Sequence, residues 1–551
     1  MGRRKGCLLQ GESLIAKRSI AMHVKNAVIL AAGKSLSFAP FSYETPKALF
    51  KVKGETLIER LIRQLKEAGV ENVAVVVGSM REKLYFLEDK WGVRIIENSL
   101  YASKNNIYSL QLARDYLGDG FLCHCDNYYP ENPFLKHEPS DVSYRQAIAK
   151  IGLDGEFNCY VDSKDCVSRI TVNDIEAGLS LIGYAYLTKD FAQKFISLYD
   201  ETQKGLCADR LFWEEFVGMH LDKLRLHVKR VAANEVLEFD SVEEVREFDP
   251  TLIDNLNSGI VKNICTTLNC VASEITGIKA LTKGLTNVSF LFSVREGRYV
   301  YRHPGGSSSS LVNRYGEFQA QNIAYELCID KTLVYIHPHE GWKISHYVEG
   351  AYDFDYRDVN ALHEVLRLLR KLHTCGKSIE YVYDPLVTAD KMMALACNTD
   401  ASLRSTYAQT RAKLGKLFNY TRMDGVLYCL CHNDSYWPNF LISNNSLDLI
   451  DWEYAGMCDP ANDFGGIIGR DKFHDDNEIE DLLAAYLGHN PTAFERRHYF
   501  SFIPISAWVY FCWSLFKAGV NEPNGFFMHD CYRQISKFTD RMLAEYEGVR
   551  K

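Results

Sequence analysis

The N-terminal half of the chain alternates short apolar runs with segments of helical spacing. Apolar runs that predict strands are "NAVILAAG", "NVAVVVG" and "GFLCHCD". Between the first two, "ETLIERLIRQLKEAGV" repeats apolar residues three and four positions apart, which predicts an amphipathic helix. Strands that are apolar throughout and separated by helices predict a parallel sheet covered on both faces. Ligands of such sheets bind beyond the carboxyl ends of the strands, where Gly33 and Asp126 fall.

The pattern changes at roughly residues 250–260. The stretch "KALTKGLTNVSFLFSVREGRYVYRHPG" alternates at period two and predicts antiparallel strands. A helix ("RYGEFQAQNIAYELCI") and a strand ("WKISHYV") follow, and the rest is mainly helical. We therefore expect an α/β protein with a disordered leader over 1–25, a Rossmann-like domain over 26–252 and a bilobal, kinase-like α+β domain over 256–551.

Composition adds limits to this picture. The chain has 551 residues and a net charge of −8, so nothing global favours nucleic acid or an anionic membrane as a partner. No run approaches the ~18 apolar residues of a membrane span. The 16 cysteines are scattered without pairs at zinc-site spacing, which predicts reduced core thiols in a cytoplasmic protein. The oligomeric state is left open.

The loop after the first apolar run has the character of a phosphate cradle. Ala31, Ala32 and Gly33 are small, so backbone amides can approach phosphate oxygens closely. Lys47 in "TPKAL" adds a positive charge for a triphosphate.

Two carboxylates complete this first candidate site. Asp126 ends an apolar strand, where a carboxylate is costly unless it meets a cation, and Asp240 in "EFDS" is its candidate partner. Two carboxylates and a phosphate make a hard-oxygen site, which predicts Mg²⁺ as the cofactor.

The order of "LAAG", "TPKAL", "VVVG", "NN" at 105–106 and "CDN" resembles the nucleotidyltransferase family, most closely the bacterial CTP:phosphocholine cytidylyltransferases. The resemblance covers roughly 26–250 and implies transfer of a nucleoside monophosphate from CTP to a phosphate or phosphonate oxygen, with release of pyrophosphate. It implies three sets of site residues: Ala31, Ala32, Gly33, Lys34 and the catalytic Lys47 for the nucleotide; Asp126 and Asp240 for the metal; and Tyr128, Phe157 and Trp213 for the acceptor pocket.

The phosphate loop departs from the family pattern of Gly-x-Gly-x-Arg. Here the sequence is "GKSLSF", so Ser35 stands at the second glycine and Ser37 at the arginine. A bidentate clamp for the triphosphate is missing, and Lys34 is a point charge that substitutes for it only in part.

A second set of polar residues stands in "CHNDSYWPNFLISNNSLDLIDWEYAG". Phosphoryl transfer needs a carboxylate near the acceptor hydroxyl and oxygen ligands for Mg²⁺. We assign Asp434 as the base, Asn439 and Asp451 as metal ligands, and His432 as a brace for the loop.

Sequence segments upstream of this stretch are also typical of a kinase. Asn287, in the turn "KGLTN", is suited to covering phosphates, and Arg302 stands where kinases carry a strand lysine, with Glu317 as its ion-pair partner. Tyr347 and Val348 resemble a hinge that would meet adenine. The segment of roughly residues 256–551 resembles the choline/ethanolamine kinase and aminoglycoside phosphotransferase family.

A quaternary ammonium cannot donate an N–H hydrogen bond, so aromatic faces and carboxylates must hold it. Candidate aromatic residues for the kinase acceptor are Trp437, Trp452, Tyr454, Trp508 and Trp513. Each of them also fits an ordinary place in the hydrophobic core.

Together the halves predict a bifunctional enzyme whose small-molecule substrates are ATP, choline, CTP and phosphocholine, and whose product is CDP-choline. One alternative is 2-aminoethylphosphonate or phosphoethanolamine as the first acceptor, since Glu214 and Glu215 beside Trp213 suit a primary amine. Another is a CTP-binding regulatory first domain on an active kinase, motivated by Ser35 and Ser37.

Overall fold

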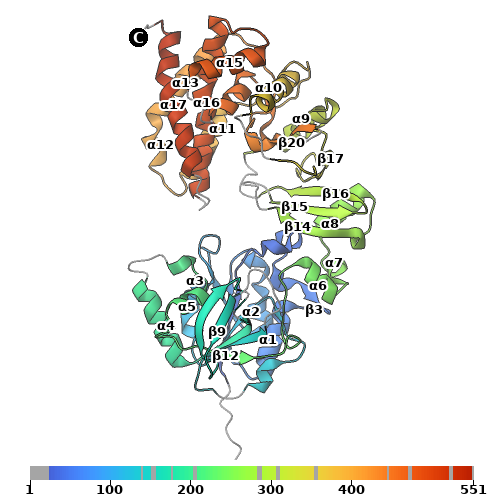
Figure 1. Ribbon diagram of the computed structural model, residues 1–551, viewed down its shortest axis with the longest axis vertical. Coiled ribbons are helices and arrows are strands. Elements are labelled where there is room, and N and C mark those ends of the chain that lie inside the picture. The colour runs from blue at the N-terminus through green and yellow to red at the C-terminus, as the bar shows by residue number, and fades with distance from the viewer. Residues whose placement is uncertain are drawn as a thin grey trace, which may run out of the picture. The chain divides into compact units, whose positions relative to one another are not determined.

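The chain forms two compact units, residues 1–258 and 259–551, which are described separately below (Figure 1). The computed structural model describes residues 24–137, 140–149, 157–174, 176, 178–202, 208–281, 288–305, 311–352, 358–443, 446–469, 475–519 and 525–548.

Unit 1 is built on a mixed sheet with strand order β10-β9-β11-β6-β1-β4-β5; in addition β8 pairs with β11, and β12 pairs with β8. Strands β6, β1, β4 and β5 are parallel, whereas β11 runs antiparallel to β6. The strands are β1 (Asn26–Ala31), β2 (Lys51–Val52), β3 (Glu55–Thr56), β4 (Asn72–Val77), β5 (Arg94–Glu97), β6 (Gly120–His124), β7 (Asn127–Tyr128), β8 (Tyr144–Ala149), β9 (Phe157–Val161), β10 (Val167–Val172), β11 (Leu179–Leu187), β12 (His227–Arg230) and β13 (Leu237–Glu238). The helices are α1 (Leu57–Glu67), α2 (Phe86–Trp91), α3 (Asn106–Leu112), α4 (Lys189–Thr202), α5 (Trp213–Met219), α6 (Val242–Phe248) and α7 (Leu252–Asn255).

Strand β1 shows why the sequence is apolar without alternation. Ala27 and Ile29 belong to the core on one face of the sheet, and Val28 and Leu30 belong to the core on the other. Because both faces are covered, both sets of side chains are buried.

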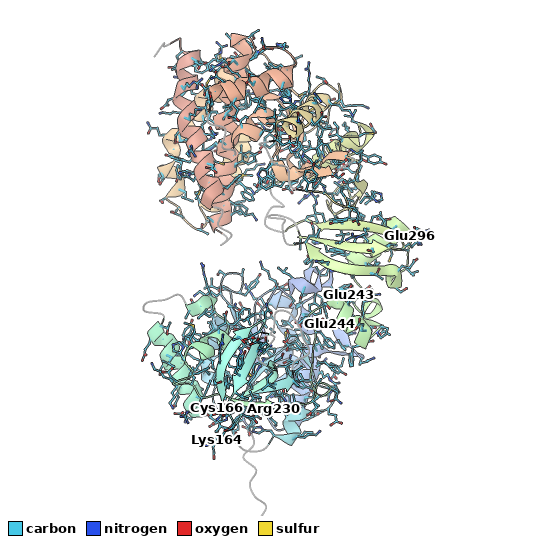
Figure 2. All side chains as sticks on the ribbon, in the orientation of Figure 1. Lys164, Cys166, Arg230, Glu243, Glu244 and Glu296 are labelled. Atoms are coloured by element: carbon cyan, nitrogen blue, oxygen red, sulfur yellow. The ribbon has the colours of Figure 1, made fainter. Side chains whose placement is uncertain are left out.

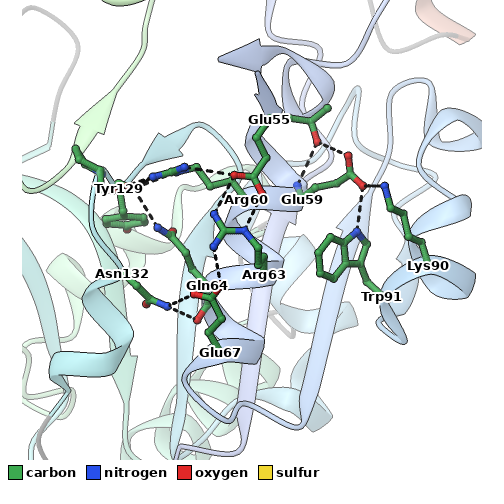
Figure 3. A network of polar contacts seen from close by, with 12 residues as sticks. Glu55, Glu59, Arg60, Arg63, Gln64, Glu67, Lys90, Trp91, Tyr129 and Asn132 are labelled. Atoms are coloured by element: carbon green, nitrogen blue, oxygen red, sulfur yellow. Dashed lines mark hydrogen bonds and ion pairs between the residues drawn. The ribbon is translucent and has the colours of Figure 1, made fainter. Parts of the chain in front are cut away.

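Helix α1 fixes the segment that follows β6. Thr56 caps the helix by accepting a hydrogen bond from the Glu59 amide. Arg60 and Gln64 both donate to the carbonyl oxygen of Tyr129, within the polar network of Figure 3. The backbone just beyond Asp126 is therefore held by side chains of a regular helix.

Unit 2 begins with α8 (Gly259–Leu268) and an antiparallel sheet of order β14-β15-β16-β18-β17. This agrees with the period-two pattern of the sequence. The strands are β14 (Ile275–Leu281), β15 (Val288–Val294), β16 (Gly297–His303), β17 (Leu333–Ile336) and β18 (Lys343–His346). Helix α9 (Arg314–Glu326) connects β16 to β17.

The rest of unit 2 is mainly helical. Its helices are α10 (Val359–His373), α11 (Pro385–Ala396), α12 (Leu403–Thr406), α13 (Ala408–Met423), α14 (Ala461–Gly469), α15 (Asp476–Leu487), α16 (Ala493–Gly519) and α17 (Gly525–Tyr546). Two short strand pairs frame the loops between α13 and α14, namely β19 (Cys429–Cys431) with β22 (Gly456–Cys458) and β20 (Phe440–Ser443) with β21 (Ser446–Leu449).

Helix α16 is long and apolar enough to cross a membrane, but its apolar window is entirely buried inside unit 2. This is the behaviour of a core helix. Side chains fill both units (Figure 2), and at one end of unit 1 Arg230 donates to Asp165, close to Cys166. The predicted fold class, a Rossmann-like α/β domain followed by an α+β domain with a β-rich and a helical lobe, is confirmed.

Candidate active sites

The carboxyl end of the sheet in unit 1 gathers Lys47, Asp126 and the segment around Asp240. The Nζ atom of Lys47 lies 3.3 Å from Oδ2 of Asp126 and also donates to the carbonyl oxygen of Phe239. It lies 4.1 Å from the ring centroid of Phe38. The lysine is buried, so its amino group is fixed by three partners rather than moving freely in solvent.

Strand pairing places a third carboxylate here. β13 pairs antiparallel with β7, with Glu238 opposite Asn127. Burial, with the nearby charges of Asp126 and Asp240, raises the pKa of Glu238 to about 8. Burial also raises the pKa of Asp240. The sequence analysis missed Glu238, although it stands only two residues before the predicted ligand Asp240.

These acids fit a divalent cation. Oδ1 of Asp126 is buried and has no hydrogen-bond partner among the described residues. Burial first, and then the charges of Asp126 and Asp240, disfavour the ionised form of Glu238, and a hard cation would offset both effects. Asp126, Glu238 and Asp240 are the residues that would hold Mg²⁺.

The loop after β1 has the shape of a ligand cradle. Ala31 and Ala32 are buried, whereas Gly33 and Lys34 are exposed. A side chain at Gly78, the last residue of "VVVG", would come within 2.6 Å of the Ala32 carbonyl oxygen, so glycine is needed for this close approach.

Ser35 keeps the backbone of the glycine it replaces. Its φ is 47° and its ψ is 51°, in the left-handed region that glycine adopts without strain. Ser37 is exposed at the position of the missing arginine.

The predicted acceptor aromatics lie in different surroundings. Tyr128 and Trp213 are buried, and each already has an arginine near its ring: Arg60 lies 4.3 Å from the centroid of Tyr128 and Arg145 lies 5.6 Å from Trp213. Phe157 is half-buried.

Phe157 forms an edge-on pair with Phe212, with centroids 5.4 Å apart. Phe212 is 41% exposed, so this pair lies at the surface of the unit beside the start of α5. Among the described residues, no lysine or arginine side chain lies over the ring of Phe157, whereas an arginine lies near each of the rings of Tyr128 and Trp213.

The two glutamates after Trp213 have separate roles. Glu215 accepts a hydrogen bond from the amide of Phe212 and so caps α5. Glu214 is buried, and its Oε1 lies 3.8 Å from Nη2 of Arg145 and 3.9 Å from Nε2 of His124. Burial raises the pKa of Glu214 and, helped by Arg145, lowers that of His124 to about 4.

In unit 2 the predicted kinase residues meet around the loop after β19. Nδ2 of Asn439 donates to the Asp434 backbone oxygen (2.9 Å) and to its carboxylate (3.0 Å). This leaves the amide oxygen of Asn439 for a metal. Nη1 of Arg302 lies 3.2 Å from Oδ1 of Asp451, and Arg302 also pairs with Glu317. Oxygen donors from Asn439 and Asp451 suit Mg²⁺.

Asp463, at the start of α14, braces the catalytic loop. Its carboxylate accepts from the backbone amides of His432 and Asn433, and from Nε2 of His373. The His373 contact and the two amides hold the pKa of this buried carboxyl below its usual range. His432 itself contacts the Ile450 carbonyl oxygen. The sequence analysis did not find Asp463; its signal was an acid in the apolar run "ANDFGGIIG".

The residues of unit 2 that were predicted to bind the nucleotide differ in their surroundings. Tyr347 follows β18, and its amide already donates to the carbonyl oxygen of Arg298. Val348 is half-buried, and the role of both residues toward adenine stays a prediction. Asn287 lies outside the described residues. Lys343, which the sequence analysis missed, is buried beside Arg302 and donates to Gln321.

The five predicted acceptor aromatics of unit 2 do not form one group. Trp452 is buried against His432, and Tyr454 is buried near Asp434, whose charge raises its pKa further. Trp508 packs against Phe511 and Tyr407. The rings that gather beside the catalytic loop are Tyr436, Trp437, Tyr510, Trp513 and Phe527.

Comparison with known proteins is consistent with this geometry. Residues 27–175 match the family model of the MobA-like NTP transferase domain, and residues 277–500 match that of the phosphotransferase enzyme family. Choline-phosphate cytidylyltransferase of Streptococcus pneumoniae is 31% identical over 226 residues, which is 41% of this chain and 97% of that protein. The N-terminal unit belongs to the cytidylyltransferases.

A second relative of the cytidylyltransferase unit carries a different name. It is 2-aminoethylphosphonate cytidylyltransferase of Lancefieldella rimae, 32% identical over 41% of this chain and 92% of that protein. The phosphotransferase unit is similar to the solved structure of choline kinase LicA from Streptococcus pneumoniae (22% identity, 51% of this chain and 98% of that one, TM-score 0.44). The predicted fusion of a nucleotidyltransferase with a phosphotransferase is confirmed.

Proposed function

We propose that the chain carries two activities on small amines: ATP-dependent phosphorylation of an amino alcohol by unit 2, and CTP-dependent cytidylylation of an amine-bearing phosphate or phosphonate by unit 1. The observation that supports the second activity is the fixed contact of Lys47 with Asp126, beside a carboxylate oxygen that has no protein partner. Choline and phosphocholine, expected from the sequence, stay predictions.

In the cytidylyltransferase unit, Lys47 holds triphosphate oxygens of CTP while small residues of the loop let backbone amides approach them. Bound Mg²⁺ on the acids would neutralise charge that develops on the phosphates. An acceptor oxygen, already ionised at neutral pH, forms a bond to the α-phosphorus as the bond to the β-phosphate oxygen breaks. Pyrophosphate leaves with that electron pair, and no covalent enzyme intermediate is required.

In the phosphotransferase unit, Asp434 accepts the proton of the substrate hydroxyl. The hydroxyl oxygen forms a bond to the γ-phosphorus as the bond to the β-phosphate oxygen breaks, which releases ADP. Mg²⁺ on Asn439 and Asp451 would orient the phosphates. Arg302, tied to Asp451 and Glu317, fixes the metal side of the site.

The test is pyrophosphate release by the purified full chain with CTP, Mg²⁺ and one of phosphocholine, phosphoethanolamine or 2-aminoethylphosphonate. ADP release with ATP and choline or ethanolamine is measured in parallel. Pyrophosphate release with at least one acceptor, absent from an Asp126→Ala variant, supports the proposed function. CTP binding without pyrophosphate release would instead favour a regulatory first domain.

A further inference from the structure

Beside the candidate metal carboxylates of unit 1, a cluster of buried, ion-paired side chains has several polar atoms without hydrogen bonds. Oε2 of Glu214, Nε of Arg145, Nε2 of His124 and Nε1 of Trp213 are all buried and make no hydrogen bond of regular geometry among the described residues. The side chains of Asn106 and Trp213 lie close to the Glu214 carboxylate and favour its charged form. Glu214 and Arg145 are each only 3% exposed. Native proteins rarely leave buried polar atoms unsatisfied, so several in one place point to a ligand that supplies the missing bonds.

This cluster lies at the reaction centre. His124 is the last residue of β6 and stands two residues before Asp126. Glu214 opens α5, whose first amide, that of Trp213, donates to Asn106 at the start of α3. Arg145 is on β8 and is anchored by its 2.6 Å hydrogen bond to the Gly183 carbonyl oxygen. All four groups are therefore positioned by regular elements.

The aromatic faces near this cluster already have cations. The guanidinium of Arg145 lies near the ring of Trp213, and that of Arg60 lies 4.3 Å from the centroid of Tyr128. A quaternary ammonium is held by aromatic faces that are free to receive it. Two of the three expected faces are thus occupied by arginine.

We propose that the cytidylyltransferase unit selects an acceptor with a primary ammonium group, which donates N–H hydrogen bonds to Glu214 and reaches the polar cluster around His124, rather than a quaternary ammonium. This inference rests on the proposed cytidylyl transfer at the same site. A trimethylated nitrogen has no N–H group and would bury Glu214 Oε2 unsatisfied, at a cost of about ten- to a hundredfold in binding, which corresponds to ~1.4–2.8 kcal/mol.

The direct test is a methylation series. The purified full chain is assayed for pyrophosphate release with CTP, Mg²⁺ and phosphoethanolamine carrying none, one, two or three N-methyl groups. We expect kcat/KM to fall with methylation and to be at least about tenfold lower for phosphocholine. Equal or rising kcat/KM along the series would overturn the proposal.

A binding measurement separates this inference from the proposed activity. Titration calorimetry with CDP-ethanolamine and CDP-choline reports the head-group preference even if no turnover occurs. CDP-ethanolamine is expected to bind at least about tenfold more tightly. Equal affinities, or tighter CDP-choline, would overturn the head-group inference, whereas absent pyrophosphate release with a preserved preference would count against the transferase activity alone.

Two variants test which residue sets the preference for CDP-ethanolamine over CDP-choline. Glu214→Gln keeps the size of the side chain but removes its charge, so it should reduce the preference for CDP-ethanolamine to less than about threefold. Glu215→Gln, the matched neighbour that caps α5, should leave the preference unchanged. If both variants keep the full preference, Glu214 is not the residue that distinguishes the ethanolamine head group from the choline head group. Circular dichroism of both proteins checks that each is folded.

Discussion

Arg302 and Glu317 form an ion pair that is closed to solvent, with the glutamate fully buried and the arginine 6% exposed. Arg302 also reaches Asp451, the candidate metal ligand, at 3.2 Å. Because a single guanidinium serves both carboxylates, the stability of the β-rich lobe and the geometry of the metal site depend on the same side chain.

Replacing Arg302 should therefore affect folding as well as catalysis. Arg302→Met leaves the buried Glu317 with Arg314 as its remaining ion-pair partner, at 2.9 Å, so it should cost about 1–3 kcal/mol of unfolding free energy. Arg302→Lys keeps the charge but loses the fork that reaches two acids, so it should cost less and mainly raise KM for ATP. Urea unfolding and ADP release measure the two effects. A fully stable Met variant would contradict the role given to this pair.

The two activities should be separable by single substitutions. Asp434→Asn removes the base of unit 2 and should lower ADP release by about 10²–10⁴-fold while pyrophosphate release is kept. Asp126→Asn should do the reverse, with a loss above about 100-fold, since even residues behind a metal ligand cost 10–100-fold. Both products are measured on the same preparations. Loss of both activities from either substitution would argue against two independent sites.

The phosphate loop can be returned to the family pattern. Ser35→Gly relieves a left-handed backbone and should stabilise unit 1 by about 0.5–1 kcal/mol. Ser37→Arg offers a bidentate donor to the triphosphate and should lower KM for CTP several-fold. Thermal unfolding and pyrophosphate kinetics check these effects. Lys34→Arg, on the same loop, is the matched control for adding a guanidinium. An equal decrease in KM for CTP from Lys34→Arg would contradict a specific role for an arginine at position 37.

His498 should make unit 2 sensitive to pH. It is buried between Asp424 (2.8 Å) and Asp459 (3.0 Å), and despite its burial these carboxylates raise its pKa. A raised histidine pKa stabilises the fold fully below the unfolded value of about 6.5, and that stabilisation is lost as pH rises through the folded pKa. The midpoint of urea unfolding should therefore fall above pH 6.5.

Tryptophan fluorescence follows this transition, since five of the seven tryptophans lie in unit 2. His498→Gln should remove the pH dependence and lower stability, because Asp459 loses its histidine partner while Asp424 keeps only Arg497 as a cation. His489→Gln, at an exposed histidine, should change neither. An unchanged pH profile in the His498 variant would contradict the assignment.

The sequence indicated the ends of strands well, because an acid or glycine after an apolar run has few structural explanations. Lys47 and Asp126, 79 residues apart, do meet. Arg302 and Glu317 do as well. Asp126 stood at the end of a predicted strand, and Glu317 stood on the helix predicted after the strand of Arg302.

The other contacts of the two candidate sites depend on strand pairing and side-chain packing, which the periodicity of the sequence does not reveal. Glu238 reaches the first site only because β13 pairs with β7, and Arg145 meets Glu214 across 69 positions of sequence. Trp508 and Trp513 separate because five residues turn a helix by about 140° beyond a full turn, so Trp508 packs against Tyr407 while Trp513 faces Phe527.

The contact between Lys47 and the carbonyl oxygen of Phe239 has a consequence for how the protein is made. A chain leaving the ribosome presents β1, the loop and β6 long before residues 237–240 emerge. Domains generally fold as units during synthesis, so unit 1 completes its nucleotide site only after residues 237–240 have been made. A nascent chain stalled near residue 200 would lack β12 of the sheet as well as Glu238 and Asp240, so CTP capture should wait until the unit is nearly complete.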